Sequence, residues 1–179
     1  MLQISNPDQI HLLSFIPKHL NRRIKNECLQ VRNNYDDITI EYTEDGIILA
    51  TFKRKNNIYT FDIPSNYPFT PPRLTLNSQS LSNLYDLKTN RFRKILKYIN
   101  GMDCFCCNSY LCKDNWGPAI TFDKIICQTE QFKTIKYRIF LKLILDKIKE
   151  KYLNRDIELD SWLFNVYDPR LCYPGKTIH

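Results

Sequence analysis

Four cysteines lie within nine residues near the middle of the chain: Cys104, Cys106, Cys107 and Cys112. A cysteine thiolate can attack the carbonyl carbon of a thioester, and it can also bind a soft metal ion. Packing alone does not require four cysteines in one short segment, although a free cysteine often serves as a small apolar residue. This cluster is therefore the first place to look for chemistry.

The redox state of these thiols follows from the whole chain. It has seven cysteines, an odd number, and its first residues, MLQISNPDQIHLL, lack the basic start and apolar stretch of a secretory signal. We therefore expect reduced thiols and a location in the cytoplasm or nucleus, not a disulfide framework. Cys28 and Cys127 fall on apolar helical stripes, where we expect them to be buried packing residues.

A metal site is one use that the cluster leaves open. Cys104 and Cys107 form one C-x2-C pair, and Cys112 follows five residues later. A structural zinc ion needs four ligands, usually from two such pairs, and the sequence has no second pair. Cys104, Cys107 and Cys112 therefore remain a weakly signalled metal set.

Nucleophilic catalysis is the other use. A cysteine hydrolase needs a histidine base, and the only histidines are His11, His19 and His179, far from the cluster in sequence. A cysteine that works without histidine favours thioester exchange, because the incoming acyl group is already activated. The cluster is thus better suited to acyl transfer than to hydrolysis.

The composition describes an ordinary globular chain. It has 179 residues, 43% hydrophobic and 25% charged, which fits one domain. No apolar run approaches the ~20 residues that cross a bilayer, so we expect no membrane partner. The net charge of +7 is spread from end to end. This pattern favours a solvated surface over a nucleic-acid interface.

Periodicity predicts an α+β fold. Residues 7–32 read as a helix in two pieces broken at Pro17, and the short links between the next apolar runs predict an antiparallel meander. Polar, irregular residues follow at 77–90. The predicted strands are 37–43, 46–53, 57–63 and 73–76, and the predicted later helices are 91–99, one starting at 122, and 135–152. We expect one domain over residues 1–153 and a C-terminal extension over 154–179.

Two motifs in this order resemble those of ubiquitin-conjugating enzymes. The first is Tyr67-Pro68-Phe69-Thr70-Pro71-Pro72, and the second is Asn115-Trp116-Gly117-Pro118-Ala119. The resemblance covers roughly residues 17–130. It implies that family's fold, with an N-terminal helix, a four-stranded antiparallel meander and C-terminal helices. It also implies that ubiquitin, or a ubiquitin-like modifier, passes from an activating enzyme to a cysteine and then to a lysine or a ligase, with no cofactor.

The resemblance also implies the catalytic residues. The family's cysteine precedes its tryptophan by a short interval, and Cys107 lies nine residues before Trp116. We predict that Cys107 is the nucleophile, with Cys106 as the alternative. The family's His-Pro-Asn motif is missing, and Asn100 stands near its asparagine. Asn100 either supports the oxyanion or only ends the preceding helix.

The implied partner surfaces lie on three segments. The positions where the family meets ligases are matched here by Phe69, Pro118 and Ala119. The alternative is a structural role, with Phe69 buried and Pro118 forming a turn. The first helix carries three basic residues that would meet the activating enzyme, or that simply face solvent: Arg22, Arg23 and Lys25.

The departures from the family keep two other functions open. The missing His-Pro-Asn motif and the small number of glycines, four in all, indicate a divergent member of the family. Isoleucine, asparagine and lysine are abundant together, which is typical of an AT-rich genome and fits a viral member. One alternative is an inactive binding or scaffold module of the same fold. The other is a zinc-stapled basic module that binds nucleic acid. The lack of aromatic residues interleaved with basic ones, as base stacking would need, disfavours it.

Overall fold

The computed structural model describes residues 18–43 and 47–152. The described residues fall into two compact units, one within Met1–Asp86 and Phe105–Ile126 and the other within Leu87–Cys104 and Cys127–His179. Two sequence predictions fall outside the described residues: the first piece of the N-terminal helix, before Pro17, and the extension over 154–179.

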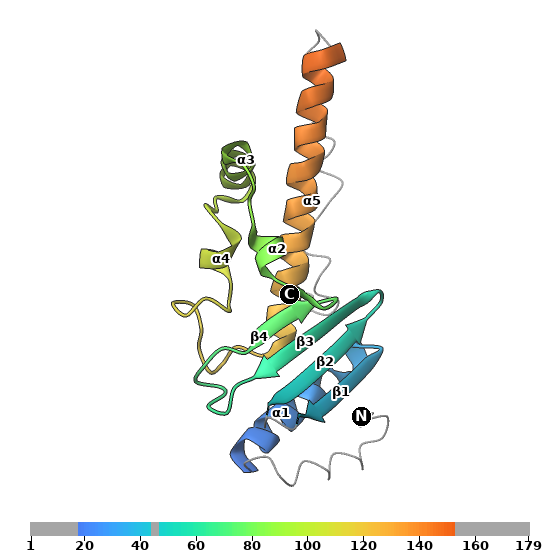
Figure 1. The fold of residues 1–179 in the computed structure, drawn as a ribbon, viewed down its shortest axis with the longest axis vertical. Coiled ribbons are helices and arrows are strands. Elements are labelled where there is room, and N and C mark those ends of the chain that lie inside the picture. Colours follow the sequence, from blue (N-terminus) through green and yellow to red (C-terminus); the bar gives the residue numbers. More distant parts are fainter. Residues whose placement is uncertain (1–17, 44–46, 153–179) are drawn as a thin grey trace, which may run out of the picture. The chain divides into compact units, whose positions relative to one another are not determined.

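The described elements confirm the α+β class (Figure 1). An N-terminal helix precedes the strands, and further helices follow them. The helices are α1 (Lys18–Val31), the 3-10 turn η2 (Arg32–Asn34), α2 (Ser82–Tyr85), α3 (Asn90–Asn100), α4 (Phe105–Asn108) and α5 (Phe122–Tyr152). The strands are β1 (Asp37–Tyr42), β2 (Ile48–Arg54), β3 (Asn57–Ile63), β4 (Arg73–Leu76) and β5 (Gln79–Ser80).

The strands form one antiparallel meander in chain order, β1-β2-β3-β4-β5. Alternate side chains enter the core, as a sheet with one covered face requires. In β3 the sequence left two possible faces; Tyr59 and Phe61 are fully buried, whereas Ile58 is exposed. The register pairs Phe61 with Ala50 of β2, which leaves room for the aromatic ring.

The prediction of four strands was wrong, because a fifth strand of two residues pairs with β4. The turn between them is Asn77-Ser78, and both residues have positive φ, 50° and 63°. Such turns usually contain glycine. Here Asn77 holds the turn instead, since its Oδ1 accepts a hydrogen bond from the Ile58 amide at 2.8 Å. Without a glycine the segment resembled an irregular loop.

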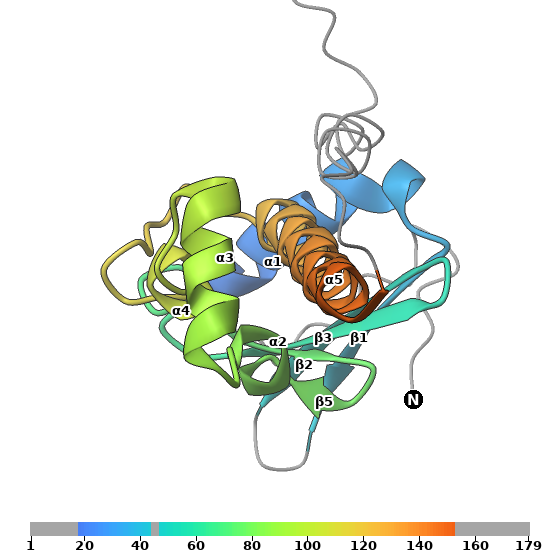
Figure 2. The same ribbon diagram turned by 90° about the horizontal axis from the view of Figure 1, so that it is seen from above.

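The main core lies in the first unit. Ile24, Cys28 and Val31 on α1 share one stripe and pack with buried residues of the sheet. Figure 2 shows α1 on one face of the strands. Phe122 at the start of α5 completes this core, with its ring 4.7 Å from that of Phe61. Tyr67 of the first sequence motif belongs to this core, and Trp116 of the second motif packs against it.

The second unit contains α3 and most of α5. Thr89 caps α3, because its Oγ1 accepts a hydrogen bond from the Phe92 amide at 3.2 Å. Gly101 ends α3 in the left-handed conformation, with φ at 69°. The helices predicted from 122 and over 135–152 form one continuous helix, α5. Arg91 of α3 pairs with Asp146 of α5 at 3.3 Å.

Candidate active site

The middle of the cysteine cluster is helical, because residues 105–108 form the short helix α4. Phe105 at its start is fully buried and anchors it. The next two side chains, Cys106 and Cys107, are exposed. One buried aromatic residue therefore fixes the backbone while the two adjacent thiols face solvent, where a macromolecular substrate can reach them.

The turn after α4 is held by two polar side chains. Asn115 donates from its Nδ2 to the Cys107 carbonyl at 2.6 Å and to the Ser109 carbonyl at 3.1 Å. The buried Ser109 accepts from the Leu111 amide at 3.1 Å. These bonds hold the backbone that carries Cys107 and the turn that follows it.

A cavity of about 240 Å³ lies beside the thiols. The hydroxyls of Tyr85 and Ser109 are hydrogen-bonded at 2.8 Å on its wall. Burial raises the pKa of Tyr85; the Ser109 bond lowers it somewhat, and the nearby Cys106 raises it further. Tyr85 is therefore a neutral hydrogen-bonding group at physiological pH. The cavity is lined by Tyr85, Cys106, Cys107, Ser109, Leu111 and Cys112.

The two sequence motifs lie against each other. Trp116 donates from its indole nitrogen to the Pro68 carbonyl at 2.9 Å, across 48 positions of sequence. Its ring also lies 6.1 Å from that of Tyr67, which is buried. Tyr67 is therefore a packing residue of the core. The proline segment thus supports the residues that follow the cysteines.

A buried carboxylate that sequence reasoning missed joins three parts of the first unit. Glu27 of α1 is only 3% exposed. It accepts hydrogen bonds from the Tyr67 hydroxyl at 2.7 Å and from the Phe122 amide at 2.9 Å. Arg23 pairs with it one helical turn earlier. The carboxylate therefore links α1, the proline segment and the first turn of α5.

The pKa values around Glu27 reflect this burial. Burial is the largest cause of the raised pKa of Tyr67, and the neighbouring Glu27 carboxylate adds to it. For Arg23, burial is the largest cause and lowers the pKa, but the attraction and hydrogen bonding of Glu27, with smaller contributions from Tyr67, together outweigh it and the net shift is upward. Tyr67 thus stays a neutral donor and Arg23 stays a cation, which is the charge pattern that the pair requires.

The candidate ligase surface is exposed. Phe69 is 78% exposed, which excludes the alternative that it is a buried packing residue. Pro118 and Ala119 are also exposed. Arg23 of α1 donates from its Nη2 to the Pro118 carbonyl at 2.9 Å, so one basic residue has a structural partner there. Of the other two basic residues on α1, Arg22 is exposed and Lys25 is partly exposed.

Asn100, the predicted oxyanion donor, is the last residue of α3 and is exposed. Gly101 directly after it caps the helix, in line with the alternative that Asn100 only ends α3. Asn100 belongs to the second unit and Cys107 to the first. The catalytic role of Asn100 therefore stays a prediction.

The two cysteines predicted to be packing residues are both buried, Cys28 at 8% and Cys127 at 7% exposure. Burial, with a smaller effect of Glu27, raises the pKa of the Cys28 thiol to about 12 from an ordinary value of 9.0. Its thiolate, the reactive form, is scarce at neutral pH.

We therefore expect a sharp difference in alkylation. Iodoacetamide at pH 8 should label Cys106 and Cys107 rapidly, whereas Cys28 should react about 10³-fold more slowly than an ordinary thiol, since its pKa is raised by about three units. Timed quenching and peptide mass spectrometry measure each rate. Full labelling in denaturant is the control. Equal rates for Cys28 and Cys107 in the folded chain would contradict the assigned burial.

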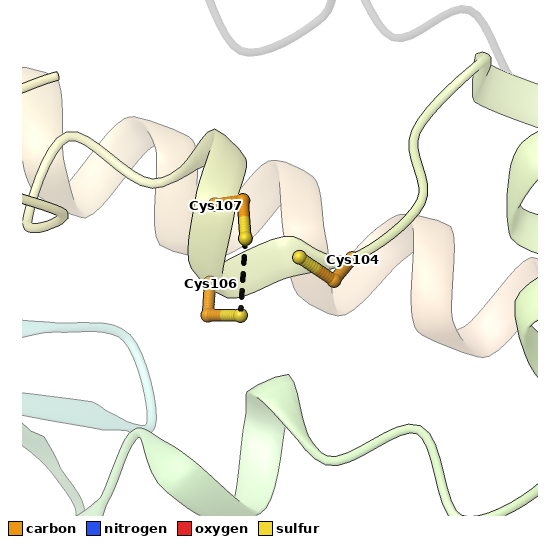
Figure 3. Close-up of side chains that lie close together, drawn as sticks. All are labelled: Cys104, Cys106 and Cys107. Carbon is orange, nitrogen blue, oxygen red and sulfur yellow. Dashed lines mark hydrogen bonds between the residues drawn. The ribbon is translucent and has the colours of Figure 1, made fainter. Parts of the chain in front are cut away.

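Three of the thiols lie close together. The sulfur atoms of Cys104, Cys106 and Cys107 all lie within 4.8 Å of one another (Figure 3). The sulfur atoms of Cys106 and Cys107 are 3.8 Å apart. Within the described residues, the structure thus groups Cys106, in place of the predicted Cys112, with Cys104 and Cys107.

Comparison with protein-family models, with curated proteins and with solved structures found no match to this chain. None of the helices in the described ranges combines the length and the apolarity that crossing a membrane needs.

Proposed function

We propose that this chain is a divergent ubiquitin-conjugating enzyme that carries ubiquitin, or a related modifier, as a thioester on Cys107. The observation that carries the proposal is the hydrogen bond from Trp116 to the Pro68 carbonyl. It places together the two motifs on which the resemblance rests. The exposed thiols of Cys106 and Cys107 belong to the same unit as both motifs and precede Trp116 in the chain.

The proposed reaction is an exchange between two thioesters. The Cys107 thiolate attacks the carbonyl carbon of the thioester between ubiquitin and the activating enzyme. The carbon–sulfur bond to the activating enzyme breaks, and its cysteine leaves as a thiolate. In the second step a lysine amine attacks the new thioester, Cys107 leaves, and the amine loses a proton to solvent. No net oxidation occurs, and no metal or organic cofactor takes part.

Cys107 is favoured over Cys106 by its position in the segment. Both thiols are exposed and both line the same cavity. The backbone carbonyl of each residue also accepts a hydrogen bond, from the Asn115 side chain for Cys107 and from the Ser109 amide at 3.2 Å for Cys106. The choice therefore rests on the spacing in sequence, since Cys107 lies nine residues before Trp116.

The surroundings support the handling of a protein substrate. The cavity beside the thiols is open to solvent, so the extended end of a modifier can reach them. Phe69, Pro118 and Ala119 offer an exposed apolar surface to a ligase. The Arg23 bond to the Pro118 carbonyl ties α1, where the activating enzyme would bind, to that surface. A location in the cytoplasm or nucleus stays a prediction.

A discharge experiment distinguishes an active carrier from an inactive scaffold of the same fold. The full chain is incubated with activating enzyme, ATP and ubiquitin, ATP is then removed, and free lysine is added. We expect a thiol-sensitive adduct that disappears as ubiquityl-lysine forms. Serine added in place of lysine is the control for simple hydrolysis. Failure to form any adduct with ubiquitin or its relatives would leave the scaffold as the better account.

A further inference from the structure

The geometry of the three adjacent thiols points to a use beyond acyl transfer. The sulfur atoms of Cys104, Cys106 and Cys107 lie within 4.8 Å of one another. The three residues occupy four consecutive positions, so the local turn into α4 sets their spacing. Figure 3 shows the side chains of Cys106 and Cys107 near that of Cys104.

These separations suit one metal ion. Zinc bonds to thiolate sulfur at about 2.3 Å, and in a tetrahedral site two such sulfurs lie ~3.8 Å apart. The Cys106 and Cys107 sulfurs are already 3.8 Å apart. The sulfur of Cys104 lies at most 4.8 Å from the other two sulfur atoms, about 1 Å more than a tetrahedral site needs. Rotation of one cysteine side chain about its χ1 bond can close this difference. Because Cys106 and Cys107 are exposed, an ion can reach them from solvent.

We propose that Cys104, Cys106 and Cys107 bind a zinc ion through three thiolates, with the fourth position open to water. Each thiol loses its proton on binding, so three protons are released and no electron is transferred. Soft sulfur ligands select zinc over magnesium or calcium, which prefer oxygen. The exposure of two of the thiols also argues against packing as their purpose.

Zinc binding has a direct consequence for the proposed reaction. A Cys107 thiolate bound to zinc cannot also attack a thioester, so metal binding and ubiquitin transfer exclude each other at this residue. The zinc site itself rests on the sulfur geometry alone and needs no enzymatic activity.

Cobalt substitution tests the site without any activity assay. The reduced, metal-free full chain is titrated with Co²⁺ and then with Zn²⁺ in the presence of a competing chelator. We expect one ion per chain and the thiolate-to-cobalt absorption bands of a three-sulfur site. Cys104→Ser, Cys106→Ser and Cys107→Ser should each weaken zinc binding by at least about tenfold. Far-ultraviolet circular dichroism checks that each variant is folded.

Cys112→Ser is the matched control, because Cys112 lines the same cavity but lies outside the three-sulfur group. We expect unchanged zinc affinity. Loss of binding in Cys112→Ser but not in Cys106→Ser would overturn the assignment in favour of the set read from sequence. Absence of one-to-one binding would overturn the zinc site altogether, whereas zinc binding without ubiquitin transfer would contradict only the proposed enzyme.

Discussion

Cys107→Ser is expected to abolish the thiol-sensitive ubiquitin adduct. A hydroxyl at this position cannot form a thioester, and serine is a far weaker nucleophile than cysteine when no base activates it. Any product would be an oxyester that survives reducing agent, formed at least about 10³-fold more slowly. Because the Cys107 side chain is exposed, serine fits without repacking. Non-reducing gels with and without thiol measure the change.

Cys106→Ser is the matched control for this result. Cys106 is also exposed, lies one position earlier on α4 and lines the same cavity. We expect adduct formation to persist in this variant. If Cys106→Ser loses the adduct while Cys107→Ser keeps it, the nucleophile has been assigned to the wrong neighbour.

The second large effect is on stability. Glu27→Ala removes the acceptor for the Tyr67 hydroxyl and the Phe122 amide, and it leaves Arg23 without its carboxylate. Without the carboxylate, the Tyr67 hydroxyl and the Phe122 amide are left buried and unsatisfied, whereas Arg23, whose side chain is 33% exposed, turns to solvent. We expect the free energy of unfolding to fall by about 2–5 kcal/mol. Urea denaturation followed by circular dichroism measures it.

Glu41→Ala supplies the comparison for Glu27→Ala. Glu41 lies on β1 and is only partly buried, so this variant should change the free energy of unfolding by about 0.5 kcal/mol or less. Similar losses in the two variants would show that the buried network contributes nothing specific. Tyr67→Phe, which removes one bond to the carboxylate, should fall between them, at about 1.5–3 kcal/mol.

The strands could be predicted from sequence because apolar residues alternate along them. This alternation, with the short links between runs, was enough to place β1 to β4. It could not choose between the two faces of β3, since Ile58 and Tyr59 are both apolar; the choice depends on what packs against the sheet. The fifth strand was missed because its turn uses Asn77 and Ser78 where a glycine would be the usual signal.

The site was predicted less completely. The cysteines and the two motifs could be found because their residue types and spacing are local. Glu27 gave no signal, because its partners Tyr67 and Phe122 lie 40 and 95 positions away in sequence. Asn115 was noted only as part of a motif, and its bond to the Cys107 carbonyl depends on how the turn folds. Long-range polar contacts of this kind follow from packing and not from periodicity.

The mass of the charged protein tests the central claim most directly. The wild-type chain is incubated with activating enzyme, ATP and ubiquitin, quenched in acid, and analysed as intact protein and as peptides. We predict one added ubiquitin per chain, attached at Cys107 and removed by thiol treatment. No added mass, or attachment at a lysine or at another cysteine, would contradict the account.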